Sequence, residues 1–187
     1  MRKWTSFTDC PTRSYTYRVK GTDTMAITPA EIEDILEQLA RTPLRIAAWS
    51  SIYDEGRMYL KPQEEAWSVN DVLAHLRACA EVWGKSIRIM IAQDHPTLRY
   101  VSPRTWIRKT NLSQQEFPNA LKAFTEQRGE LMSFLKTLRI EDWSRGATFT
   151  GTTRGREPTV FSFAQRIAQH ESEHCIQIDA LLQTMQN

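Results

Sequence analysis

The chain has 187 residues, of which 41% are hydrophobic and 25% are charged, values that exclude global disorder. Its 24 basic and 22 acidic side chains give a formal charge of +2, too even for a protein dedicated to binding nucleic acid. The longest apolar runs fall far short of the roughly 20 residues that span a bilayer, so no membrane helix is expected. Cys10, Cys79 and Cys175 lack the spacing of a disulfide framework, which indicates a reducing compartment and predicts a cytoplasmic protein.

Residues 1–24 differ from the rest of the chain. They hold five basic and two acidic side chains, and they show neither helical nor strand periodicity. The continuous apolar core of a secretory signal is missing from them. We expect residues 1–24 to form a poorly ordered tail, with a strap ordered on the domain as the alternative, and residues 25–187 to form one domain.

Helix-start signals followed by apolar residues at helical spacing predict four helices, covering residues 28–52, 68–94, 113–138 and 159–185. Thr28 begins a capping box with Pro at the first helical position, and Ser68 caps the second helix. Pro43 is expected to kink or re-cap the first helix. The third helix begins at either Ser113 or Phe117.

No convincing pair of strands lies between these segments, so the sequence predicts an all-α four-helix bundle. Helix hairpins usually need about 2–8 linking residues, whereas roughly 18 separate the second and third helices. An extended linker of that size spans up to ~60 Å, longer than the ~37 Å of a 25-residue helix. The linker can therefore run back along the bundle. We expect an up-down-down-up order with a long crossover between helices two and three.

Two histidines interrupt the apolar stripe of the fourth helix. His170 and His174 are spaced i, i+4 within a stripe formed by Phe163, Ile167, Ile178, Leu181 and Met185. Burying one imidazole without a partner costs on the order of 1–3 kcal/mol, and a metal ion supplies a partner for two. The alternative is a pair of core histidines satisfied by neighbouring side chains. His75, early in the second helix, is a candidate third ligand, whereas His95 precedes a proline and is expected at the surface.

Two segments resemble a known family. Residues 67–76 (WSVNDVLAHL) resemble the W-S-x-x-(D/E)-x-x-x-H signature of DinB-like proteins, the superfamily that includes YfiT-type proteins. Residues 170–174 (HESEH) resemble the H-x-x-x-H signature of its last helix, and the resemblance covers about residues 28–185. It implies an up-down-down-up bundle, often homodimeric, with a divalent metal, zinc or nickel, held by His75, His170 and His174. Known activities of the family include thiol S-transfer, maleylpyruvate isomerisation and hydrolysis.

The segment HESEH also spells the H-E-x-x-H motif of zinc proteases, in which Glu171 would be the general base. Such a protease needs a third ligand further along the chain, but the 13 residues after His174 contain neither His nor Glu. Proteolysis is therefore not favoured. Two roles stay open for Glu171: a general base beside the metal ligands, or an ion pair with Arg166 or another basic group.

Three neutral imidazoles leave a divalent ion with its +2 charge and at least one open position for water or thiolate. We therefore predict a metal-dependent thiol S-transferase or hydrolase that acts on a small molecule, possible substrates including a low-molecular-weight thiol. The alternative is a non-catalytic metal-binding or dimeric interaction module. Neither nucleic acid nor a membrane is expected as a partner.

Two further features bear on this site. Cys79 lies one turn beyond His75 and is either a core residue or a close neighbour of the metal, while Cys175 is expected in the core. The linker over residues 95–112 carries only basic charges, on Arg99, Arg104, Arg108 and Lys109. It is either a solvated crossover or a lip that attracts an anionic substrate.

Overall fold

The computed structural model describes residues 26–151 and 157–184. Within these ranges the main elements are four long helices: α1 (Pro29–Ile52), α2 (Val69–Ala92), α4 (Phe117–Lys136) and α5 (Val160–Thr184). The prediction of an all-α four-helix bundle is confirmed. No helix in the described ranges combines the length and the apolar character needed to cross a membrane. The predicted tail, residues 1–24, lies outside the described residues, so the domain boundary at residue 25 stays a prediction.

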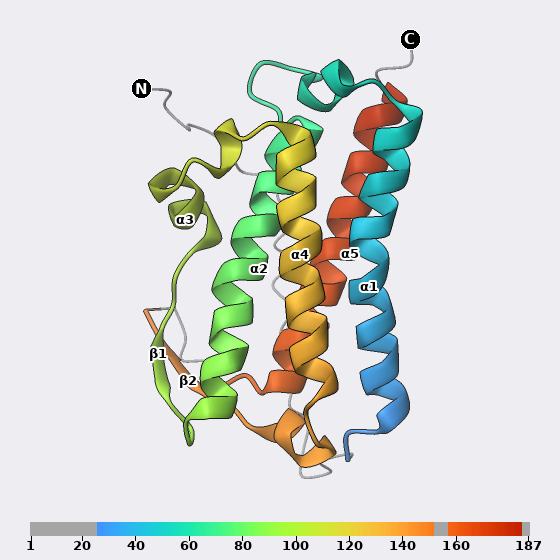
Figure 1. Cartoon of the computed structure of the whole chain (residues 1–187). Helices are drawn as coiled ribbons and strands as arrows, with labels where there is room; N and C mark the ends of the chain where they lie inside the picture. The colour runs from blue at the N-terminus through green and yellow to red at the C-terminus, as the bar shows by residue number, and fades with distance from the viewer. Residues whose placement is uncertain (1–25, 152–156, 185–187) are drawn as a thin grey trace.

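The four helices pack so that chain neighbours are not always spatial neighbours. In Figure 1, α1 rises, α2 and α4 both descend, and α5 rises again. Both α1 and α2 pack against α4 and against α5, which places α4 and α5 at opposite corners of the bundle. The metal-ligand candidates of α2 and α5 can therefore meet along a direct helix–helix contact.

The crossover from α2 to α4 runs back along the outer side of α2 (Figure 1). It contains β1 (Thr97–Arg99), the short helix α3 (Pro103–Lys109) and the single turn η2 (Leu112–Gln114). Two further 3₁₀ turns, η1 (Glu55–Tyr59) and η3 (Ile140–Ser144), lie at the ends of the bundle. The long crossover is what allows α2 and α4 to run in the same direction.

One pair of strands was not expected from the sequence. β1 pairs in parallel with β2 (Thr148–Thr150), with Leu98 opposite Phe149. The prediction that no strand pair is present was therefore wrong. Strands of three residues are too short to show the alternation by which a strand is detected in a sequence.

The helix starts follow their capping signals. The Thr28 hydroxyl accepts a hydrogen bond from the Glu31 amide, while the Glu31 carboxylate accepts one from the Thr28 amide. Ser68 and Asp71 form the same reciprocal pair at the start of α2. The helix is not re-capped at Pro43, because α1 continues as a single helix through this residue, and a kink there stays a prediction. The proline ring is buried there, which offsets the backbone hydrogen bond that it cannot donate.

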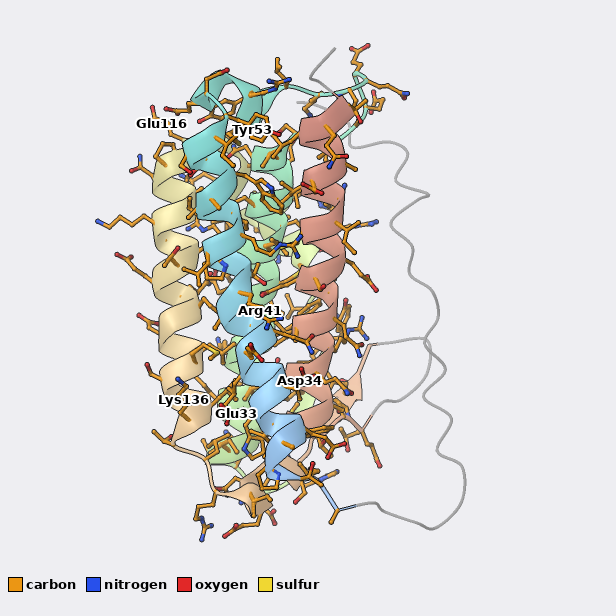
Figure 2. The ribbon with its side chains drawn as sticks, turned by 90° about the vertical axis from the view of Figure 1, so that its right-hand side faces the viewer. Glu33, Asp34, Arg41, Tyr53, Glu116 and Lys136 are labelled. Carbon is orange, nitrogen blue, oxygen red and sulfur yellow. The ribbon has the colours of Figure 1, made fainter. Side chains whose placement is uncertain are left out.

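The interior consists of two apolar clusters. The lower cluster, at the bottom of Figure 1, includes Ile35, Leu39, Trp83, Ile87, Met90, Leu131, Leu135 and Ile167. The upper cluster includes Ile46, Met58, Val72, Leu76, Phe117, Phe124, Ile178 and Leu182. By contrast, the outer surface of α1 is charged, as Glu33, Asp34 and Arg41 show in Figure 2.

A set of buried polar residues lies about halfway along the bundle, between the two apolar clusters. We call this set the polar layer: Thr42, His75, Arg128, Glu171 and His174. On α1, α4 and α5 these residues fall between the positions that feed the lower and the upper cluster. Each long helix contributes at least one member. A charged or polar layer inside an apolar core requires internal partners, and those partners define the site.

Candidate metal centre

Three imidazoles meet where α2 packs against α5. His75 comes from α2, and His170 and His174 come from successive turns of α5. His170 Nε2 lies 3.1 Å from His75 Nε2 and 3.1 Å from His174 Nε2. One ring nitrogen from each of the three lies within 4.8 Å of the others, a grouping that could hold a metal ion. The structure thus brings together the three histidines that the sequence singled out.

These imidazoles are neutral at physiological pH. His75 and His174 are 7% and 5% exposed, and His170 is partly exposed. Burial, together with the neighbouring histidines, lowers the pKa of His75 to about 3 and that of His170 to about 2. Burial also lowers the pKa of His174. A neutral imidazole is the form that binds a metal.

The short distances between the histidine nitrogens are better explained by a shared metal ion than by hydrogen bonds among the three rings. His170 Nε2 faces two nitrogens but can carry only one proton, so at most one of its two 3.1 Å contacts is a good hydrogen bond. Two nitrogens 3.1 Å apart could both bind one divalent cation at ordinary zinc–nitrogen bond lengths of about 2.0–2.1 Å. Three imidazole nitrogens of this kind, in two pairs 3.1 Å apart, are a donor set that suits a divalent ion.

The orientation of His174 is set by a neighbour on the same helix. Its Nδ1 lies 2.8 Å from the side-chain oxygen of Gln177. Because that oxygen can only accept, Nδ1 carries the proton and Nε2 keeps its lone pair toward the other histidines. Partners of this kind fix the tautomer and the ring orientation of metal-binding histidines.

Two tryptophans and a cysteine surround the triad. The Trp67 ring packs against His75 with ring centroids 5.1 Å apart, and the Trp83 ring packs against His170 at 4.9 Å. Cys79 Sγ lies 3.6 Å from His75 Nε2, so it is a close neighbour of the site. Among the described residues, the group that converges as a ligand set contains histidines only. Cys175 is buried in the core, as expected.

Glu171 is fully buried between the two α5 histidines in sequence, and its partner is Arg128 of α4. Arg128 Nη2 donates to Glu171 Oε1, and both side chains are almost completely inaccessible to solvent. Burial lowers the pKa of Arg128 to about 10, which leaves the guanidinium charged at neutral pH. Of the two roles weighed for Glu171, the structure thus shows the ion pair, formed with Arg128 and not with Arg166.

Arg128 was missed as a site residue, although the sequence held a signal for it. It occupies an apolar position of α4, within the stripe Leu121, Phe124, Leu131 and Leu135. A charged residue inside such a stripe indicates a buried partner. The predicted stripe of α5 is buried at Ile167, His174 and Ile178, but the buried face is wider than predicted and also includes Ala164, Ala168, Glu171, Cys175 and Leu182. Pairing with Arg128 is what allows Glu171 to face inward.

The remaining sequence candidates lie outside the triad. His95 is exposed in the loop before β1, where its backbone has a φ of 38° and its Nε2 contacts Thr148 Oγ1. A shallow hollow between α1 and α4, lined by apolar side chains such as Ile32, Leu36 and Leu135, contains none of the three histidines. Metal chemistry is therefore assigned to the α2–α5 contact and not to this hollow.

The fold and the site together define a four-helix bundle with a candidate three-histidine metal centre between its second and last long helices. The model of the DinB superfamily matches residues 38–178, and the chain belongs to that superfamily. Among solved structures it is similar to YfiT from Bacillus subtilis, described as a probable metal-dependent hydrolase with an unusual four-helix bundle topology. The TM-score is 0.74 at 17% identity, over 89% of this chain and 94% of that chain, a likeness of fold. No curated protein matches the sequence.

Proposed function

We propose that the protein is a metal-dependent enzyme acting on a small molecule, with zinc or nickel held by His75, His170 and His174. The observation that carries this proposal is the convergence of three neutral imidazole nitrogens, two pairs of them 3.1 Å apart. When bound, a divalent ion with three histidine ligands keeps an open position and lowers the pKa of a bound water or thiol toward neutrality. Thiol S-transfer and hydrolysis are the reactions that this chemistry supports.

The surrounding residues have separate tasks in this proposal. Gln177 holds the His174 ring with Nε2 toward the metal, and Trp67 and Trp83 exclude water from two sides of the triad. His170 is the partly exposed member, so substrate approaches from its side. The description of YfiT as a probable metal-dependent hydrolase supports this assignment, because the two chains share the fold.

Glu171 is proposed as a general base through Oε2, the carboxylate oxygen that accepts no hydrogen bond from the described residues. A Glu171→Gln variant that keeps its metal should then lose at least about 10²-fold in turnover. Retention of full turnover would assign Glu171 to the ion pair with Arg128 alone.

The metal is tested by mass spectrometry of untagged protein. We expect about one zinc or nickel per chain in the wild type, its loss in His174→Ala, and its retention in His95→Ala, a matched control at an exposed histidine. A wild-type protein that takes up neither metal, even after addition, would overturn the proposal. A loaded protein should next be screened with thiols and electrophiles and with hydrolysable esters and amides.

The alternative of a non-catalytic interaction module has its own observation. Leu44 of α1 and Ile176 of α5 are 69% and 64% exposed on helices that pack side by side. A homodimer and a cytoplasmic location both stay predictions from the sequence. Sedimentation of the wild type and of Leu44→Ser with Ile176→Ser tests the dimer, which the double variant should weaken.

A further inference from the structure

A hollow in the surface of the bundle takes no part in the proposed metal centre. It lies in the seam between α1 and α4, whereas the histidine triad lies at the contact between α2 and α5. Because α1 and α2 each pack against both α4 and α5, these two contacts are on opposite edges of the bundle. A molecule bound in the hollow would therefore leave the three histidines untouched.

The hollow has an apolar wall that the described residues leave partly open to solvent. Its lining includes Ile32 and Leu36 of α1, Met132 and Leu135 of α4, and Ile140 of η3. Ile140 is 47% exposed, and Ile32 and Leu36 are only partly buried. Single exposed apolar side chains are ordinary, but several gathered in one hollow indicate an interaction site.

The rim of the hollow is acidic on its α1 side. Glu33 and Glu37 lie on this side, and Lys136 lies on the α4 side. Figure 2 shows Glu33 on the side of α1 that faces α4, while the neighbouring Asp34 lies on the side that faces α5. Glu37 also pairs with Arg41, but an ion pair on the surface is weak in water. The hollow therefore suits an occupant with apolar groups and with positive charge next to α1.

The segment that precedes α1 enters the described structure beside this hollow. Ile27 packs against the lower cluster, and Pro29, the first residue of α1, lines the hollow itself. Residues 1–25 are therefore tethered to its edge. A tether of this kind gives an effective concentration in the millimolar range, so even weak contacts are enough for binding.

Residues 13–20 (RSYTYRVK) have the composition that the hollow suits. They contain Tyr15 and Tyr17 together with three basic side chains and no acidic one. When extended, this stretch spans ~26 Å, which exceeds the ~17 Å of helix over residues 29–40, the part of α1 that lines the hollow. A four-residue turn within residues 21–25 would reverse the direction of the chain. The stretch is therefore long enough to lie along the whole hollow.

We propose that residues 13–20 bind in the hollow between α1 and α4, with Tyr15 and Tyr17 against its apolar wall and the basic side chains beside Glu33 and Glu37. This is the ordered strap that the sequence leaves open as the alternative to a tail. Tyrosine suits the role, because it buries a large apolar ring while its hydroxyl stays in water. The proposal does not depend on the metal centre.

The test measures disulfide formation in the whole chain carrying Cys10→Ser, with oxidised glutathione as the oxidant. The other two native cysteines are buried. Thr16→Cys is combined with Lys136→Cys at the rim of the hollow, or with Asp34→Cys as the matched control. Asp34 is exposed and nearer in sequence to Thr16, but it lies on the other side of α1. The first pair should close at least about tenfold faster than the second.

Further substitutions in the first pair identify the residues that hold the strap. Tyr15→Ser with Tyr17→Ser should slow closure to the rate of the control pair, because the apolar anchors are gone. Trp4→Ser with Phe7→Ser is the matched control, since both aromatic residues lie outside residues 13–20, and it should leave the rate unchanged. Glu33→Gln should slow closure about threefold, the size expected of one exposed ion pair.

Each outcome supports or overturns the strap. Equal rates for the two pairs, or a first pair that stays fast without both tyrosines, would overturn the proposal. Equal slowing by the loss of Trp4 and Phe7 would overturn the assignment to residues 13–20. Disulfides formed between chains instead of within one chain would make a second copy the occupant of the hollow, which also overturns it. A fast first pair that slows only when the tyrosines or Glu33 are replaced supports the strap.

Discussion

Consecutive turns of α5 carry a pair of histidines, His170 and His174, and a buried glutamate, Glu171. The polar atoms of the histidines and of the glutamate find different kinds of partner. His170 and His174 turn Nε2 toward His75, so that three nitrogen donors face each other without any opposite charge. Glu171, between them in sequence, turns to Arg128, and that pair is neutral within the protein. The triad is chemically incomplete without a cation, whereas the ion pair is complete in charge.

This difference separates the candidate metal ligands from an ion pair that braces α5, although Glu171 keeps a second carboxylate oxygen, Oε2, without a partner among the described residues. Removing charge from water is costly, and an internal counter-charge offsets that cost only when both partners stay together. The ion pair links opposite corners of the bundle, α4 and α5, at the height of the triad. The ion pair with α4 therefore restrains the rotation of α5 about its axis. This restraint keeps His170 and His174 directed toward His75.

The largest expected effect comes from breaking the ion pair. Arg128→Met leaves Glu171 buried and unpaired, which should lower the free energy of unfolding by about 3–5 kcal/mol. Arg128→Met combined with Glu171→Met should recover most of that loss, because no charge is then left unpaired. Urea denaturation of the metal-free proteins measures both effects. A single variant that loses less than about 1 kcal/mol would contradict the view of the pair as a buried support.

Removing the metal should have the next largest effect on stability. This effect depends on the histidine triad and not on the ion pair. With free metal at about 100 times its dissociation constant, binding adds about 2.7 kcal/mol, or roughly 5–10 °C in melting temperature. A chelator should remove this increment from the wild type and from the Arg128→Met, Glu171→Met protein. It should leave His170→Ala unchanged, because that variant has no increment to lose. Equal chelator effects on all three proteins would mean that the metal binds elsewhere.

The same contrast explains what the sequence could and could not predict. The pair His170 and His174 was predictable because the two residues are one turn apart on an apolar stripe, whereas His75 joined them as a ligand through the resemblance to DinB-like proteins. Spacing within one element is local information. Arg128 and Glu171 are 43 residues apart on different helices, and no local motif links them. Their pairing depends on which corners of the bundle α4 and α5 occupy, and that is a property of the tertiary packing.

The crossover between α2 and α4 likewise contains contacts between distant residues that no local sequence pattern predicts. Its length predicted that it could return along the bundle, but not that β1 would pair with β2 or that α3 would form. The β1–β2 register joins residues about 50 positions apart, and α3 has only seven residues. Composition suggested Arg104 only as one of four basic residues, whereas in the structure its charge contributes to the lowered pKa of His75.

A smaller effect should follow from the partner of His174. Gln177→Leu removes the acceptor that holds Nδ1–H, and we expect metal affinity to fall about 10–100-fold with little change in the stability of the metal-free protein. Competition with a chromophoric chelator measures the affinity. Gln183→Leu is the matched control, because Gln183 lies on the same helix, is exposed, and bonds to Asp179 instead. Loss of affinity in both variants would point to a general effect on α5.

The smallest effect on metal binding is expected from a substitution of Cys79. The measurement shows whether this cysteine belongs to the ligand set. Its thiol lies 3.6 Å from His75 Nε2, yet the ligand set among the described residues contains only histidines. Cys79→Ala should therefore keep about one metal per chain, change its affinity by less than about threefold, and cost about 1 kcal/mol through lost packing. A loss of tenfold or more in affinity would instead make the thiolate a ligand. The bound ion would then carry less positive charge, and the site would activate a water or thiol less strongly than three neutral histidines allow.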